Sequence, residues 1–294
     1  MAQSGKRPPI WVTVAFDFHS NPTLRKILVY SVLAGLYTAF LDYLENYVLH
    51  VDFKPPSVVF SLMGTVLGLL LVFRTNTAYD RWWSGRILLS DLTNNARNFT
   101  VKIGSYLSAD TDSELRVFFA KMIANHAYAM KENLRAGIRW DEIEEVTPEI
   151  TKRLHECYHV PNEIVRIMNE KLAELYRTKK ISDTQLWELT KHTDVASDIN
   201  GSCERIRTSP VPFSYNLHLK RFIVFFAMIV PFGFIHELDY WSVLIVSLII
   251  YALAGLDAIS EEIEDPFGQD ENDLPIDRIC RMIRTNVKTL LKVK

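Results

Sequence analysis

His155, Cys157 and His159 carry the side chains that zinc prefers, and they stand at alternate positions of one short stretch. On a helix, His155 and His159 are one turn apart and share a face, but Cys157 points away from them. One helix therefore cannot present all three side chains to a metal ion. The competing interpretation is a pair of histidines near a helix C-terminus, where the helix dipole favours a positive charge.

An acidic stretch near the end of the chain is the second candidate ion site. Its oxygen-rich side chains suit hard cations such as calcium. Their spacing does not match an EF-hand loop, and a solvated acidic turn that pairs with Arg278, Arg281 and Arg284 is an alternative interpretation. The acidic residues surround Pro266, Phe267 and Gly268, and they are Glu261, Glu262, Glu264, Asp265, Asp270, Glu271 and Asp273.

Motifs of known enzyme classes are missing from the sequence. It holds no GxSxG, no Walker loop, no GxGxxG and no HExxH. We therefore predict no enzymatic activity, no firm metal site and no cofactor, with calcium as the one candidate ligand. A net charge of −2 offers no electrostatic basis for binding nucleic acid. Three widely spaced cysteines suggest neither a disulfide framework nor a CxxC metal pair.

Apolar residues concentrate in two blocks near the ends of the chain, although the overall hydrophobic content of 48% is ordinary. This clumping predicts a membrane protein with four spans. The first covers residues 27–41 and extends past Asp42 and Glu45, and the others cover residues 57–73, 221–235 and 240–256. Lys and Arg are frequent in the long middle region and scarce in the two short connections, which places that region and both termini in the cytosol.

Asp42 and Glu45 are charged residues within the first predicted span. They are three positions apart, so they share a helix face. That face looks into protein or toward an aqueous mouth, or else both carboxylates already lie at the outer interface. The sequence leaves these interpretations open.

The second span carries the most specific pattern. Thr65, Leu69 and Phe73 are four residues apart and form one stripe, and Gly64 and Gly68 form a small-xxx-small pair on another face. A pore-forming helix in a ring of subunits needs one face for close packing and one to line the pore. Contact of this stripe with lipid or with the protein core is the alternative.

The rest of the chain has a helical periodicity. Apolar residues recur every three or four positions through the middle region, and the last helix has an apolar face. We predict an all-α fold in one integrated domain: an N-terminal segment with spans one and two (residues 1–86), a cytosolic helical region (87–217), spans three and four (218–257), and an acidic turn with a C-terminal cytosolic helix (258–294).

Three motifs, in this order, resemble the bestrophin family and in particular its bacterial members. The similarity covers nearly the whole chain. The motifs are Phe60-Ser61-Leu62-Met63-Gly64 followed by Phe73, Arg74, Asn76, Tyr79, Arg81 and Trp82; the run Gly201, Cys203, Glu204, Arg205, Thr208, Pro210, Val211, Pro212 and Phe213; and residues 262–268 ending in Asp265-Pro266-Phe267-Gly268.

The resemblance implies a homopentamer in the lipid bilayer, with four membrane helices per subunit continuous with a cytosolic helical bundle around one axial pore. It places the hydrophobic neck at Thr65, Leu69 and Phe73, where Thr65 departs from the bulky residues usual in the family. It places a second, cytosolic constriction near Thr184. The calcium clasp of eukaryotic members would fall on Glu262, Asp265, Asp270 and Asp273.

The function that the resemblance implies is a channel for small ions. By family, anions such as chloride are expected, and a cation-selective (sodium-type) channel of the same architecture is the first alternative. A non-conducting membrane scaffold or sensor is the alternative from another class. The expected location is the inner (plasma) membrane, with both termini cytoplasmic.

Overall fold

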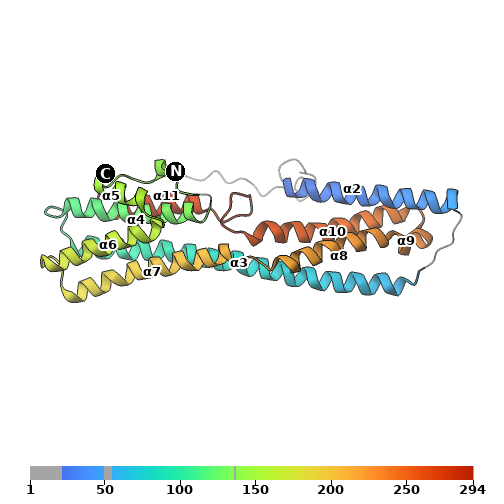
Figure 1. Ribbon diagram of the computed structural model, residues 1–294, viewed down its shortest axis with the longest axis horizontal. Coiled ribbons are helices and arrows are strands. Elements are labelled where there is room, and N and C mark those ends of the chain that lie inside the picture. The colour runs from blue at the N-terminus through green and yellow to red at the C-terminus, as the bar shows by residue number, and fades with distance from the viewer. Residues whose placement is uncertain (1–21, 50–54, 136, 294) are drawn as a thin grey trace, which may run out of the picture. The chain divides into compact units, whose positions relative to one another are not determined.

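The structure of the chain is a computed structural model that describes residues 22–49, 55–135 and 137–293 (Figure 1). The predicted N-terminal segment before residue 22 lies outside these residues. Over the described residues, all regular secondary structure is helical. The elements are α2 (Pro22–Tyr43), the π-helical turn η1 (Leu44–Leu49), α3 (Ser57–Tyr106), α4 (Ser113–Asn133), the 3₁₀ turn η2 (Trp140–Glu142), α5 (Pro148–Glu156), α6 (Val160–Arg177), α7 (Asp183–Thr208), α8 (Phe213–Ile229), α9 (Pro231–Leu238), α10 (Trp241–Glu264) and α11 (Ile276–Leu291).

The chain divides into two compact units. The first unit comprises the described residues of Met1–Tyr79 together with Val211–Glu264. The second unit comprises Asp80–Pro210 and Asp265–Lys294, again over the described residues. Each unit has its own buried apolar core, because the clumped apolar residues of the sequence collect in the first unit and the amphipathic helices in the second.

Within the described residues, four helices are long and apolar enough to cross a membrane, and each overlaps one of the four predicted spans. They are Thr23–Val48, Ser57–Tyr106, Phe213–Leu238 and Trp241–Glu264. The first begins four residues before its predicted span and the third begins eight residues before its own. In the first unit α10 packs along α2 and also contacts α8 and α9. Pro231 has no N–H to continue the hydrogen-bond ladder of α8, and the third span is accordingly split there into α8 and α9.

The second span is the beginning of a helix of 50 residues, α3. The predicted division between the second span and the cytosolic helical region falls after Arg86, whereas residues 87–106 continue the same uninterrupted helix. Proline is absent from α3, so its ladder is nowhere broken. Gly85 serves packing, because a Cβ at this position would lie 3.1 Å from both Leu274 and Phe267.

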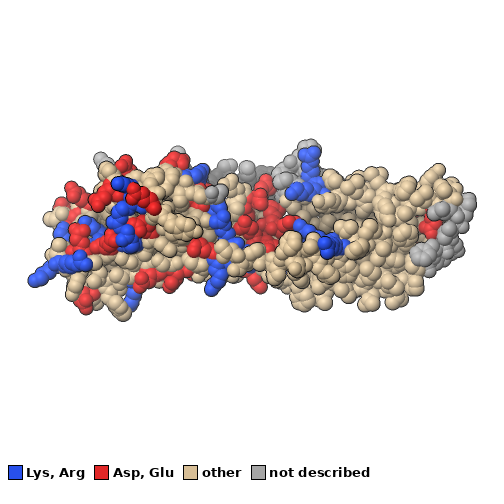
Figure 2. All heavy atoms as spheres, viewed as in Figure 1, with Lys and Arg blue, Asp and Glu red and all other residues tan. Residues whose placement is uncertain are grey.

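The second unit is a helical bundle in which α4 packs on α6 and α11, and α6 packs on α7. Its core is formed by the apolar stripes predicted from the sequence, including Phe99, Phe119 and Met122. Figure 2 shows that Lys, Arg, Asp and Glu gather over this bundle, whereas few of them lie over α2, α8 and α9 on the face shown. This distribution fits water around the second unit and an apolar solvent around the first.

Candidate functional site

The part of α3 in the first unit has two distinct faces. Leu67, Leu71, Arg74 and Ala78 are buried and recur at the three- and four-residue spacing of one helix face. On the other side the predicted stripe is exposed: Thr65 is exposed, Leu69 is 55% exposed and Phe73 is 56% exposed. The three stripe residues therefore do lie together on a face that the chain itself leaves uncovered.

Thr65 is the polar member of this stripe. Its hydroxyl group donates a hydrogen bond to the Ser61 carbonyl oxygen of the preceding turn, at 2.8 Å. The oxygen is thus bound to its own helix, and the side chain presents its methyl group together with a hydroxyl whose proton is already used. Thr65 therefore offers fewer free hydrogen-bonding groups at this surface than a residue with an unbonded hydroxyl would.

The two glycines beside the stripe differ in their surroundings. A Cβ on Gly64 would lie 3.4 Å from the Phe226 ring of α8, which is an ordinary van der Waals distance. A Cβ on Gly68 would meet nothing within 4 Å. Within one chain, Gly64 is a packing position and Gly68 faces open space.

Arg74 follows the stripe directly, and it is buried, with its side chain only 1% exposed. Its guanidinium forms an ion pair with Asp257 of α10, and Glu264 lies 4.0 Å away. Next to it, the Thr75 and Ser260 hydroxyl groups are 2.7 Å apart. Asp257 was not among the residues predicted from the sequence. It is the first acidic residue after the apolar run of the fourth span, just as Arg74 is the first basic residue after the apolar run of the second span.

Arg81, the next arginine along α3, is also held within the chain. In the second unit its guanidinium donates to the Ile206 carbonyl oxygen at 2.6 Å and to that of Ser209. These carbonyl groups end α7 and have no partner within the helix, so a cation near them is favourable.

The acidic turn is folded tightly on itself. Asp273 accepts a hydrogen bond from the Asp270 N–H at 2.6 Å, and a Cβ on Gly268 would lie 2.6 Å from the Asp273 carboxylate. Asp265 is exposed, and Glu262, in the first unit, accepts from the Thr23 hydroxyl at 2.9 Å. Within the described part of the chain, no group of three or more His, Cys, Asp or Glu could hold a metal ion. Calcium binding by this turn stays a prediction.

Thr184 lies in the first turn of α7 and is exposed. The turn is held by a capping box, in which Ser182 accepts from the Gln185 N–H at 3.2 Å and the Gln185 side chain accepts from the Ser182 N–H at 2.8 Å. Thr184 therefore stands on a fixed helix end. Its role in a constriction stays a prediction.

His155, Cys157 and His159 have separate surroundings. His155 stacks on Trp140 with ring centroids 3.7 Å apart, and the Cys157 thiol donates to the Leu154 carbonyl oxygen at 3.2 Å. His159 Nδ1 accepts from the N–H of residue 162 at the start of α6. Its Nε2 therefore carries the proton in the neutral ring and donates to Glu204 at 2.7 Å. Each of these side chains thus has its own protein partner in place of a shared metal ion. The alternative of two histidines near one helix C-terminus is correct only for His155, in the last turn of α5, because His159 is the N-cap of α6.

Asp42 and Glu45 both look into protein. Each has less than a tenth of its surface exposed. Asp42 accepts from the Asn46 amide at 2.9 Å, and Glu45 lies 2.8 Å from His236 Nε2 of α9. Of the interpretations left open by the sequence, burial within the first unit is the observed one.

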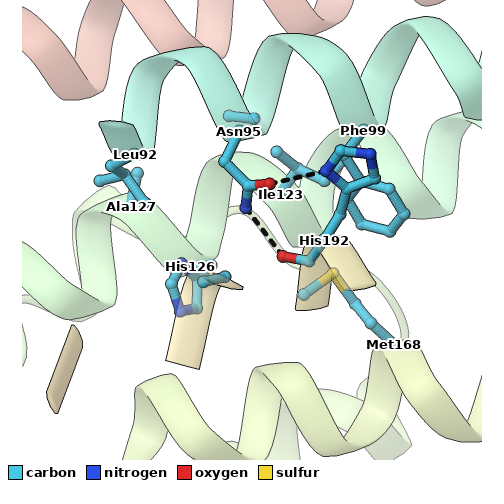
Figure 3. A pocket seen from close by; sticks show the side chains of 10 residues that line it. Leu92, Asn95, Phe99, Ile123, His126, Ala127, Met168 and His192 are labelled. Carbon is cyan, nitrogen blue, oxygen red and sulfur yellow. Dashed lines mark hydrogen bonds between the residues drawn. The ribbon is translucent and has the colours of Figure 1, made fainter. Parts of the chain in front are cut away.

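A small cavity of about 20 Å³ lies in the second unit between α3, α4, α6 and α7 (Figure 3). Burial lowers the pKa of His126, which lines it, to about 4, so this imidazole is neutral at physiological pH. On another wall, the amide nitrogen of Asn95 donates a hydrogen bond to the His192 carbonyl oxygen. The Asn95 side-chain oxygen therefore accepts one from His192 Nδ1, at 2.7 Å. The volume suits about one water molecule, so this cavity is too small to bind a solute.

Comparison with known proteins relates this arrangement to a family. The family described as "Bacterial/Fungal Bestrophin protein" matches residues 3–289. A voltage-dependent anion channel-forming protein of Nostoc sp. is 32% identical over 95% of this chain and 91% of its own length. The voltage-dependent anion channel-forming protein YneE of Escherichia coli K12 is 30% identical over 94% of this chain and 90% of its own length.

Solved structures show the same fold. The crystal structure of a bacterial bestrophin homologue from Klebsiella pneumoniae superimposes with a TM-score of 0.83 at 25% identity, over 92% of this chain and 99% of that one. The similarity thus includes the membrane-length helices and the bundle, in keeping with the order of the three sequence motifs. The chain belongs to the bacterial and fungal bestrophin family.

Proposed function

We propose that the chain is one subunit of a homopentameric channel that passes small anions such as chloride across the inner membrane, with both termini in the cytoplasm. Its relatives in Nostoc and E. coli are named as voltage-dependent anion channel-forming proteins. Thr65, Leu69 and Phe73 form the neck of the pore, and Thr184 forms a second constriction. The sequence supplies no catalytic motif for an enzymatic alternative.

The observation that carries this proposal is the uncovered stripe of α3. Leu69 and Phe73 are each more than half exposed, whereas the opposite face of the same helix is buried to the level of a protein core. The exposed face also carries the polar side chains of Ser61 and Thr65. An apolar ring with few polar atoms can hold a pore closed by dewetting.

The neck is tested by shortening its side chains. The double variant Leu69→Ala with Phe73→Ala, reconstituted into vesicles, is expected to raise halide flux because a wider and less bulky ring wets more easily. Leu244→Ala with Leu248→Ala is the matched control, since these α10 residues have the same spacing and are 49% and 57% exposed. The control should leave the flux unchanged.

Subunit number and flux are measured on the same purified sample. A pentamer that conducts supports the channel, and a well-folded protein that does not conduct overturns it in favour of a scaffold or sensor. Unchanged flux in the neck variant of a conducting protein would show that Leu69 and Phe73 do not form the constriction.

Cation selectivity is the second candidate, and one observation favours it. Arg74 and Arg81, the two arginines that follow the neck stripe in sequence, are held by Asp257 and by helix-end carbonyl groups. Their charges are thus already compensated and contribute little to attracting anions. The reversal potential under a salt gradient decides between the two, because its sign differs for chloride and for sodium permeation.

A further inference from the structure

Among the described residues of the first unit, Arg74 is the largest fully buried side chain, and it is charged. Its side chain is 1% exposed and lies in the buried row of α3 with Leu67 and Leu71. A buried charge directly after the apolar part of a membrane-length helix is costly, so such residues mark places where function requires them.

Its direction on α3 is set by helix geometry. Arg74 projects about 140° round the helix from Leu69 and about 100° from Phe73. The guanidinium is therefore on the opposite side of α3 from most of the neck stripe. Whatever fixes the direction of Arg74 also fixes the direction of Leu69 and Phe73.

The partners of Arg74 belong to α10. Asp257 forms the ion pair, and Glu264 is 4.0 Å away while it also accepts from the Val211 N–H at 2.9 Å, just before α8. One position further along α3, Thr75 meets Ser260 of α10. These polar contacts tie one side of α3 to α10.

Apolar packing contributes to this rotation, for example where the Phe60 ring lies against Gly233, but it discriminates less than the ion pair does. The apolar part of α3 carries large exposed side chains as well as large buried ones, for example Leu62 and Val66 beside Leu67 and Leu71. A turn of α3 by one residue would exchange one apolar contact for another of similar size. The same turn would pull Arg74 from Asp257 and leave both charges buried and unpaired.

We propose that Arg74, through its ion pair with Asp257, is the positioning residue that fixes the rotation of α3 and so decides which side chains line the neck. This inference rests on the proposed function, in which the α3 stripe is the neck. It assigns to Arg74 a mechanical role in the pore, although its charge does not face the permeating ions.

The rotation can be measured without any ion flux. Thr75→Cys with Ser260→Cys places two thiols where the hydroxyl groups are 2.7 Å apart, so oxidation with copper phenanthroline should cross-link α3 to α10. Burial raises the pKa of the Cys203 and Cys280 thiols to about 12, so these native cysteines react slowly. Cys157 is replaced by Ser in all samples.

Four backgrounds are compared for cross-linking rate and for halide flux. In Arg74→Met the cross-linking rate should fall by about tenfold or more, since losing a buried pair shifts a two-state equilibrium by over one power of ten. The charge exchange Arg74→Asp with Asp257→Arg should restore it. Lys220→Met is the matched control, because it removes an exposed ion pair between α8 and Glu261 of α10 in the same unit.

Flux is expected to follow cross-linking: altered in Arg74→Met, restored by the exchange and unchanged in the control. Equal cross-linking in all backgrounds, or lost cross-linking with unchanged flux, would overturn the inference while leaving a conducting channel in place. Absence of flux from the parent protein would instead refute the proposed function. Should Arg74→Met fail to fold, Arg74→Lys, which keeps the charge, is compared with Arg74→Gln. Parent-like cross-linking and flux in Arg74→Lys, together with the loss of both in Arg74→Gln, support the ion pair. Equal cross-linking and flux in these two variants contradict it.

Discussion

Lys131 allows the sharpest prediction about stability, because its side chain is fully buried among three carboxylates. The ammonium lies 2.8 Å from Glu132 and 3.0 Å from Asp277, and it also pairs with Glu142. These partners come from α4, η2 and α11, so one cation joins three elements of the second unit. The perturbation is Lys131→Met, which keeps the length and most of the volume of the side chain but removes the charge.

The size of the destabilisation depends on the ion pairs that the three carboxylates keep in the variant. Glu132 and Glu142 remain paired with Arg139 at 3.2 and 2.8 Å, and Asp277 remains paired with Arg135 at 2.9 Å. None is left wholly unpaired, so the loss should lie at the lower end of the range for breaking a buried pair, about 3 kcal/mol. That corresponds to a change of roughly a hundredfold in the unfolding equilibrium.

The stabilisation by this cluster also depends on pH, because its members ionise. Burial lowers the pKa of Lys131, but its hydrogen bonds to the carboxylates outweigh this and raise the pKa above the ordinary 10.5. The raised pKa means that this stabilisation is complete below pH 10.5 and is lost as the pH rises through the higher value in the folded protein. Burial raises the pKa of Asp277, but Lys131 and Arg135 hold it below the ordinary 3.8, so its contribution is lost only in acid.

The assay is thermal and denaturant unfolding of the detergent-solubilised protein, followed by tryptophan fluorescence. Lys152→Met is the control, because Lys152 is 75% exposed and lies 3.8 Å from Glu156 on one helix face. The Lys152→Met variant should lose less than about 0.5 kcal/mol of unfolding free energy. A Lys131→Met protein as stable as this control would refute the reasoning from burial.

Two further predictions concern other positions. The pKa of His126, lowered by burial to about 4 from 6.5, means that stability is intact above pH 6.5 and falls by about 1.4 kcal/mol per pH unit toward pH 4. His126→Gln should flatten that slope in unfolding curves taken across this range, and an unchanged slope would assign it to another group. Gly233→Ala should cost about 1–3 kcal/mol, because the new Cβ would lie 2.6 Å from the Phe60 ring. Gly68→Ala, which meets nothing within 4 Å, should melt like the parent, and equal melting of both variants would contradict the packing argument.

Local patterns in the sequence predicted much of this protein. The four apolar runs indicated the membrane-length helices, because the length and hydrophobicity of a run depend only on consecutive residues and not on the tertiary fold. The four-residue spacing of Thr65, Leu69 and Phe73 placed them on one face, since helix geometry depends only on neighbours in sequence. The bestrophin motifs identified the family for the same reason, being short and ordered along the chain.

Contacts between distant segments were decided only by the tertiary structure. In the sequence Arg74 is the first charged residue after the second span, and only the fold shows that it is buried against Asp257. Thr75 and Ser260 are 185 residues apart in the chain and 2.7 Å apart in space. No periodicity links such positions, because their pairing depends on which faces of α3 and α10 pack together. The exposed stripe follows from the local helix, and its direction follows from a partner that only the folded chain provides.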